Sequence, residues 1–382
     1  MAYHSVDRLQ KVLADEVFHY AKDRKKAAGR ALGTLVEIIT FYLLKSWGFE
    51  QSLSIERPLP EFGNPEITHN VEYSIHPVLG EVHLSLKRET LPLNGKHLLA
   101  EIPDSEYHAG SYRVLNNILL TSRKILRNSC CIAQGDHSHI VATLKTQDFF
   151  SEPLIAITEQ YSRPYAIFEC KRVGIEEGMK KGPQTIEKAK QGAYVAKSVS
   201  SLHKLRTPSG ELQGLIHKAD GTIYALPYDT LITEIVSSED AELLSHFVLT
   251  VGVVSNHGNW FTSENHNKEL KVLAQSYDWL LFLTDGGLAE FITNLLLEPL
   301  ADLLPARSAF LASYATGKKV NSFTKVSMQY DADRVLEKYF RDNAEQIERW
   351  FNVIGPKGRS ISELRSQLSL LRQKDWKAVH KT

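Results

Sequence analysis

The chain has 382 residues, of which 43% are hydrophobic and 24% are charged, values that are ordinary for a globular protein. Its 45 basic and 45 acidic residues give a formal net charge of zero, so binding to nucleic acid would require a locally basic surface. There are three cysteines, and Cys130 and Cys131 are adjacent. Neither a disulfide framework nor a zinc site is therefore expected, which favours a reducing intracellular compartment.

Nothing in the sequence predicts export or insertion into a membrane. The first residues, Met1 to Asp7, lack a basic segment that leads into an apolar stretch, so no signal peptide is expected. The most apolar stretches, such as Ile38–Leu44, are much shorter than the about 20 residues that span a bilayer. We therefore expect a soluble cytoplasmic protein without a membrane partner.

Hydrophobic periodicity predicts the elements of the first half of the chain. Apolar residues at helical spacing indicate a helix over 6–48, with Gly48 at its C-cap. Alternation predicts a hairpin within 50–87 that turns at Leu79-Gly80, and a second helix is expected over 105–127. Three short strands follow, over 140–144, 154–157 and 165–169.

The second half continues with a long helix over 184–205 and a hairpin over 212–226, which turns at Asp220-Gly221. Apolar runs predict strands buried on both faces at 247–254 and 277–283. A helix through Leu297 and amphipathic helix from about Asp331 complete the chain.

This order predicts an α/β or α+β fold, with a mixed central β-sheet flanked by helices and with added helical and hairpin elements. We expect one catalytic domain over 1–310 and a C-terminal helical region over 311–382.

The sharpest local motif is Glu169-Cys170-Lys171, at the end of an apolar strand. Residues two apart in a strand project from the same face, so Glu169 and Lys171 should stand side by side. The carboxylate suits a hard cation, and the ammonium suits the orientation or deprotonation of an attacking water. The alternative interpretation is a salt pair at a strand end.

A metal centre needs a second carboxylate. Asp148 lies about twenty residues upstream, just before the strand region 149–157, and adjacent strands would bring it opposite Glu169. Asp148 is also a plausible turn residue, because Asp favours strand entries. Asp136, in a Gly-Asp-His sequence, is the competing candidate.

These residues resemble the PD-(D/E)xK nuclease superfamily, to which most type II restriction endonucleases belong. That family has an acidic residue on one strand, (Asp/Glu)-x-Lys on the next, a helix after it and often a glutamate on an earlier helix. Glu169-Cys170-Lys171 matches the second element residue for residue. Asp148 would match the first, although Gln147 stands where the family often has proline, and Glu37 would match the helix glutamate.

The resemblance covers about residues 30–205 and also implies DNA contacts. Gln191 and Tyr194, on the helix after Lys171, resemble the helix signature of related nucleases, with simple packing as the alternative. Two polar segments, 68–73 and 255–261, are plausible DNA-reading loops because amides pair with adenine edges and aromatic rings stack. The expected DNA-binding residues are Gln191, Tyr194, Asn256, His257, Asn259, Trp260, His69 and Asn70.

The resemblance therefore implies site-specific, Mg²⁺-dependent cleavage of double-stranded DNA that leaves 5′-phosphate ends. Asp148, Glu169 and the backbone carbonyl of Cys170 would bind Mg²⁺, and Lys171 would position a water molecule. Cutting a symmetric site favours a homodimer, and the lack of a GxxxxGK[ST] motif argues against a nucleotide cofactor. The alternatives are a structure-specific repair nuclease or resolvase, and a DNA-binding protein with an inactive nuclease core.

Overall fold

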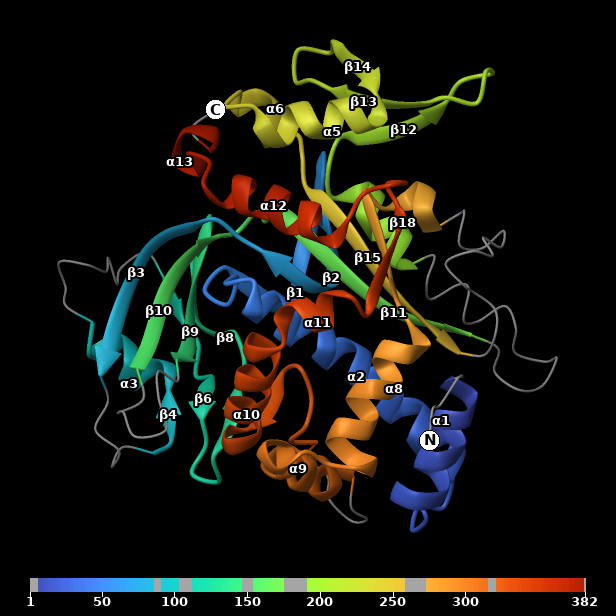
Figure 1. Ribbon diagram of the computed structural model, residues 1–382. Coiled ribbons are helices and arrows are strands. Elements are labelled where there is room, and N and C mark those ends of the chain that lie inside the picture. The colour runs from blue at the N-terminus through green and yellow to red at the C-terminus, as the bar shows by residue number, and fades with distance from the viewer. Residues whose placement is uncertain are drawn as a thin grey trace. The chain divides into compact units, whose positions relative to one another are not determined.

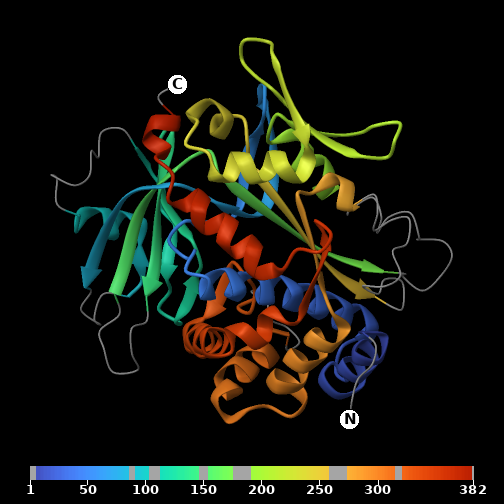
Figure 2. The ribbon, with the colours of Figure 1, turned by 45° about the horizontal axis from the view of Figure 1, so that its top comes forward.

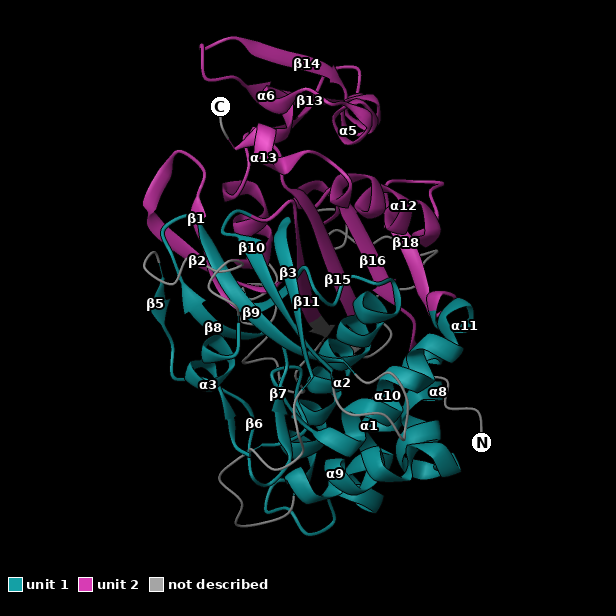
Figure 3. Ribbon diagram, turned by 90° about the vertical axis from the view of Figure 1, so that its left-hand side faces the viewer, with its two compact units in different colours: residues 1–55, 76–163, 286–347 teal, residues 56–75, 164–285, 348–382 magenta. Residues whose placement is uncertain are grey.

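The computed structural model describes residues 6–85, 91–102, 112–145, 154–174, 191–257, 273–314 and 321–380. They divide into two compact units, each built from three separate stretches of the chain (Figure 3). Unit 1 comprises residues 1–55, 76–163 and 286–347, and unit 2 comprises residues 56–75, 164–285 and 348–382. Helices and mixed sheets occur together, which confirms the expected α+β class.

Helix α2 (Arg24–Ser46) is the longest helix among the described residues, and most of its residues are buried. It begins where the Asp23 side chain accepts a hydrogen bond from the Lys26 amide, and it ends before Gly48, whose φ of 81° suits a glycine C-cap. The expected helix over 6–48 is interrupted, because α1 (Val6–Val12) and the π-helix η1 (Leu13–Val17) precede α2 as separate elements.

By length and composition, α2 is also the one described helix that could cross a membrane. Its most apolar window has a mean hydropathy of 1.4, and 67% of that window is buried inside the protein. Burial of this kind is typical of the core helix of a soluble protein.

A buried ion network joins α2 to α10 (Tyr330–Asp342) within unit 1. The Lys45 ammonium lies 2.8 Å from a Glu337 oxygen and 3.6 Å from an Asp333 oxygen. The Tyr42 hydroxyl donates to Asp333 over 2.7 Å. Because the side chains of Lys45 and Asp333 are almost fully buried, removal of the Lys45 charge would leave the Asp333 carboxylate buried without its countercharge.

The remaining helices that lie wholly or mainly in unit 1 are shorter. They are α3 (Gly95–Ala100), α8 (Asp285–Ile292), the π-helix η3 (Thr293–Leu297), the 3-10 helix η4 (Ala301–Leu303), α9 (Leu304–Tyr314) and α11 (Ala344–Glu348).

Unit 1 also contains a five-stranded and a four-stranded sheet. In order across the sheet, the first has β3 (Val78–Ser85), β10 (Leu154–Tyr161), β9 (Ser138–Lys145), β8 (Cys130–Gln134) and β5 (Arg113–Val114). The second has β17 (Ser327–Gln329), β7 (Ile125–Arg127), β6 (Ile118–Leu120) and β4 (Leu93–Asn94).

Two predictions for this region were wrong. The described part of 105–127 forms short strands instead of a helix, because cross-strand pairing and burial of Leu119 and Leu120 override its helical spacing. The expected turn at Leu79-Gly80 lies inside β3, which pairs with β10.

Unit 2 is built around a six-stranded sheet, of which only the first residues of β1 belong to unit 1 (Figure 1). Strands β15 and β16 are parallel to β11, and β2 is antiparallel to it. The apolar runs expected to be buried on both faces form β15 and β16, which confirms those predictions. The strands in order are β1 (Leu53–Glu61), β2 (Asn64–Ile75), β11 (Ala166–Gly174), β15 (Leu249–His257), β16 (Trp279–Leu283) and β18 (Phe351–Gly355).

A smaller three-stranded sheet in unit 2 consists of β12 (Leu202–Arg206), β13 (Leu212–His217) and β14 (Ile223–Pro227), with α5 (Tyr228–Ser237) packed along it (Figure 2). The β13–β14 pair confirms the predicted hairpin. The remaining named helices of unit 2 are α6 (Ala241–Ser245), α12 (Ile361–Arg372) and α13 (Trp376–Val379).

Two expected helices were too long. The described helical part of the segment predicted over 184–205 ends at residue 198, and its last residues form β12 instead. The C-terminal portion expected to be helical contains β18, which pairs with β16 in the six-stranded sheet.

The helical residues 191–198 cover one part of this sheet. Ala193 and Ala196 pack with Val254 and Tyr277, and Val195 and Val199 pack with a second apolar cluster that contains Val71 and Ile167. Each fully buried side chain of valine size contributes about 1.5–3 kcal/mol. This packing fixes the helix beside the strand that carries Glu169.

Candidate functional site

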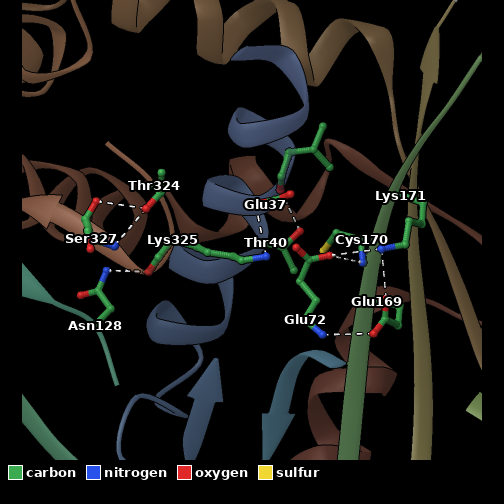
Figure 4. A network of polar contacts seen from close by, with 11 residues as sticks. Glu37, Thr40, Glu72, Asn128, Glu169, Cys170, Lys171, Thr324, Lys325 and Ser327 are labelled. Carbon is green, nitrogen blue, oxygen red and sulfur yellow. Dashed lines mark hydrogen bonds and ion pairs between the residues drawn. The ribbon is translucent and has the colours of Figure 1, made fainter. Parts of the chain in front are cut away.

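The site lies where the backbone ladder between β2 and β11 ends. Regular pairing stops at Phe168 and Tyr73. Beyond it, the Glu72 amide donates to Glu169 Oε1 over 3.1 Å, and the Cys170 amide donates to Glu72 Oε2 over 3.1 Å (Figure 4). Each of the two carboxylates thus accepts a hydrogen bond from a backbone amide of the neighbouring strand, and the side chains of Glu72 and Glu169 are held between β2 and β11.

Lys171 completes the cluster. Its Nζ atom lies 3.3 Å from Glu169 Oε2 and 3.9 Å from Glu72 Oε2. The Lys171 side chain is 33% exposed, whereas the side chains of Glu169 and Glu72 are 5% and 6% exposed. Glu169 and Lys171 stand side by side as their spacing in the strand predicts, and the ammonium is the group of the three most open to solvent.

The charges of this cluster perturb one another. Burial raises the pKa of Glu169, the Lys171 ammonium opposes this, and the neighbouring Glu72 carboxylate adds to it, so the pKa lies above the ordinary value. Burial lowers the pKa of Lys171, but the two carboxylates outweigh burial, and its pKa is raised. The site therefore favours additional positive charge, and Lys171 is protonated at neutral pH.

A tyrosine and two glycines lie beside Glu169. A Cβ atom at Gly192 would lie 2.6 Å from the Tyr277 hydroxyl and 3.3 Å from Glu169 Oε2. A Cβ at Gly252, which pairs with Glu169 in the ladder between β11 and β15, would lie 2.7 Å from the Tyr277 ring. Only glycine fits at these two positions without displacement of the ring, so they make room for Tyr277 beside the carboxylate.

The donor set suits magnesium better than zinc. Glu72 and Glu169 supply hard carboxylate oxygens, and Mg²⁺ is usually bound through one or two carboxylates while it keeps waters or substrate phosphates. Among the described residues, no group of three or more His, Cys, Asp or Glu side chains could hold a metal ion. Two carboxylates with a backbone oxygen, such as that of Cys170, would leave the other positions of an octahedral Mg²⁺ to water or substrate.

Three other acidic residues were expected from sequence to take part in the site, namely Glu37, Asp136 and Asp148. Glu37, on α2 in unit 1, has its side chain 3.3 Å from the Lys325 ammonium (Figure 4). Asp136 is exposed in unit 1, between β8 and β9. Asp148 lies outside the described residues. The strand after it, β10, pairs with β3 and β9, so the expected adjacency of this strand to β11 was wrong.

Two of the expected DNA-binding residues meet in the structure. The rings of His69, on β2, and Tyr194, in the helical residues 191–198, lie edge to face with centroids 5.5 Å apart. The imidazole of His69 lies 3.1 Å from Glu61. Tyr194 is 57% exposed, and Asn70 and Gln191 are exposed as well. Four expected contacts thus lie on the two elements that border Glu72 and Glu169.

The other four expected contacts belong to the end of β15 and the segment after it. Asn256 and His257 are the last residues of β15, in register with Val173 and Gly174 of β11. Asn259 and Trp260 lie outside the described residues.

Sequence reasoning missed Glu72, Tyr277 and the two glycines. Glu72 stands between the buried residues Val71 and Tyr73 in a strand that was predicted. The available signal was an acidic residue within a segment whose apolar residues alternate as in a strand. Tyr277 had no such signal, because its place beside Glu169 depends on tertiary packing.

Comparison of the chain with protein-family models, with curated proteins and with solved structures gave no match.

Proposed function

We propose that the protein is a Mg²⁺-dependent DNA endonuclease whose catalytic centre consists of Glu72, Glu169 and Lys171. The observation that carries this proposal is the cluster itself, in which an ammonium lies within 3.9 Å of two buried carboxylates at a strand junction. A purely structural ion pair needs one carboxylate. The second makes the site electron-rich, which suits a divalent cation.

The order of the elements supports the same proposal. An acidic residue lies on β2, Glu-x-Lys lies on β11, and the helical residues 191–198 come next. This is the order that the resemblance to the PD-(D/E)xK nucleases implies, with Glu72 in the role first expected of Asp148. Residues 76–163 are then an insertion between the two catalytic strands, and Asp148 belongs to that insertion.

In this mechanism Glu72 and Glu169 would hold the metal, and a bound Mg²⁺ would supply charge neutralisation at the scissile phosphate and activation of water. Lys171 is protonated in the free enzyme, so it begins as a hydrogen-bond donor rather than a base. It orients the attacking water or the phosphate oxygen. In-line attack by the water oxygen forms a new P–O bond and breaks the bond from phosphorus to the 3′ oxygen, so a 5′-phosphate and a 3′-hydroxyl result. The attacking water releases its proton to solvent, and the 3′ oxygen takes up a proton from solvent. Tyr277 takes no part in proton transfer, because burial raises its pKa far above neutrality.

The proposed DNA surface consists of His69, Asn70, Gln191 and Tyr194, which lie on the elements that carry or border the carboxylates. Amides and exposed aromatic rings supply hydrogen bonding and stacking to bases. Such a surface supports site-specific cleavage by a cytoplasmic type II restriction endonuclease, which would act on a symmetric site as a homodimer.

Digestion of a long duplex DNA tests this function. The wild-type protein with Mg²⁺ should give discrete bands, which should disappear with EDTA or in Lys171→Ala. Smeared products that disappear in the same controls would support the proposed catalytic centre but contradict site-specific cleavage, as expected of a structure-specific nuclease. Intact DNA in both Mg²⁺ and Mn²⁺ would contradict the nuclease and favour a DNA-binding protein.

A further inference from the structure

A second feature of unit 2 is a cavity of about 340 Å³ between the three-stranded sheet and the six-stranded sheet. Its lining comes from the end of the helical residues 191–198, from β12, from the start of β15 and from residues 275–278. Cavities that bind small molecules have volumes of about 300–1,000 Å³. None of the proposed catalytic residues lines this one.

The lining is rich in positive charge. Lys197, Lys204 and Arg206 line it together with the imidazole of His203, and the hydroxyls of Ser200 and Ser276 also contribute. Asp278 is the one carboxylate among the lining residues. Three basic side chains therefore line the cavity beside a single carboxylate.

That anion is already engaged. Asp278 Oδ2 accepts hydrogen bonds from the Thr250 amide over 2.7 Å and from the Thr250 hydroxyl over 2.9 Å. Its Oδ1 accepts from the Tyr228 hydroxyl. These bonds hold the carboxylate in the wall of the cavity, where it braces β15 and α5, and they leave the cationic side chains as the groups able to meet a ligand.

Lys204 is the deepest of these cations. Its ammonium donates to the carbonyl oxygens of Ala274 and Tyr277 and lies 4.2 Å from the centroid of the Tyr228 ring. Burial lowers the pKa of Lys204 to about 8 despite the nearby Asp278. Burial thus outweighs these contacts, so an anionic ligand in the cavity would stabilise the charged form of Lys204.

We propose that this cavity binds a phosphate group. Arginine presents a planar fork that matches phosphate oxygens, and lysine adds charge beside it. Arg206 has one donor bonded to the Gly210 carbonyl at 2.7 Å, and a guanidinium has five donors in all. Two sources offer this chemistry, a free mononucleotide or the backbone of bound DNA, and the volume of the cavity favours the first.

Isothermal titration calorimetry in EDTA tests the proposal without metal or cleavage, so its result is independent of the proposed nuclease function. The titrants are inorganic phosphate, a deoxynucleoside 5′-monophosphate and a short duplex with unphosphorylated ends. The test variant is Lys197→Ala/Arg206→Ala, in which both side chains are exposed. The control is Lys357→Ala, an exposed lysine of unit 2 that does not line the cavity.

We expect the double variant to bind phosphate and the monophosphate at least about tenfold more weakly than the wild type, because each charge-assisted hydrogen bond is worth more than a neutral one. The control should bind as the wild type does. Loss confined to the duplex would assign the cavity to a backbone phosphate. Equal affinities of wild type and double variant for all three titrants, or no binding of any, would overturn the proposal.

Discussion

Gly192→Ala would show how closely the helical residues 191–198 pack against the candidate site. Alanine in a helix is ordinarily about 1 kcal/mol more favourable than glycine. Here the added Cβ would lie 2.6 Å from the Tyr277 hydroxyl and 3.3 Å from Glu169 Oε2. Both neighbours are buried, and overpacking of this kind costs about 1–3 kcal/mol. The two effects together predict that the free energy of unfolding of Gly192→Ala is lower than that of the wild type by between about 0 and about 2 kcal/mol.

The matched control is Gly33→Ala in α2, where a Cβ would meet nothing within 4 Å. It should stabilise the protein by about 1 kcal/mol. Urea denaturation of both variants should therefore show a difference of about 1–3 kcal/mol in the free energy of unfolding. In the double variant Gly192→Ala/Tyr277→Phe the hydroxyl oxygen nearest to the added Cβ is absent, so part of the lost free energy of unfolding should be recovered. Equal stabilisation by the two alanines would refute the packing argument.

Three further predictions concern charge and the DNA surface. Because the pKa of Glu169 is raised, the metal-free protein loses stability as pH rises through the pKa of Glu169 in the folded state. The increase in melting temperature on addition of Mg²⁺ should be present at pH 7.5 and should disappear as pH falls through this pKa. An increase in melting temperature that does not depend on pH would contradict this prediction. Lys45→Met leaves the buried Asp333 without its countercharge and should lower the free energy of unfolding by about 3–5 kcal/mol. Lys338→Ala breaks an exposed pair that solvent screens and should leave the free energy of unfolding nearly unchanged; similar losses for the two variants in urea denaturation would count against the buried network. Tyr194→Ala removes an exposed ring and should weaken duplex binding in a gel-shift assay with Ca²⁺ while the melting temperature is unchanged; unaltered binding would remove Tyr194 from the DNA surface.

Local signals predicted the central strands well. Apolar runs marked β15 and β16, and the two-residue periodicity of a strand correctly placed Glu169 beside Lys171. The turn at Asp220-Gly221 likewise marked the β13–β14 hairpin, because a glycine with a φ of 83° suits that turn. In each case the deciding physics lies within a few neighbouring residues.

Features that depend on distant pairing were missed. Strand β2 pairs with β11 across an insertion of about ninety residues, so sequence proximity favoured Asp148 over Glu72 as the second carboxylate. Strand β18 was hidden among helical residues because its partner, β16, lies about seventy residues upstream. The short strands β6 and β7 have helical spacing in sequence, and tertiary burial decided their conformation.

The central claim is that Glu72 supplies the second carboxylate of a metal-dependent nuclease centre. The most direct measurement is the rate of Mg²⁺-dependent cleavage of duplex DNA by Glu72→Gln, beside Glu66→Gln at an exposed position of the same strand and Asp136→Asn and Asp148→Asn. The account predicts that Glu72→Gln loses cleavage at least about 100-fold with its fold retained, and that the other three variants cut as the wild type does. Full activity in Glu72→Gln, or its loss in Asp148→Asn instead, would contradict the account.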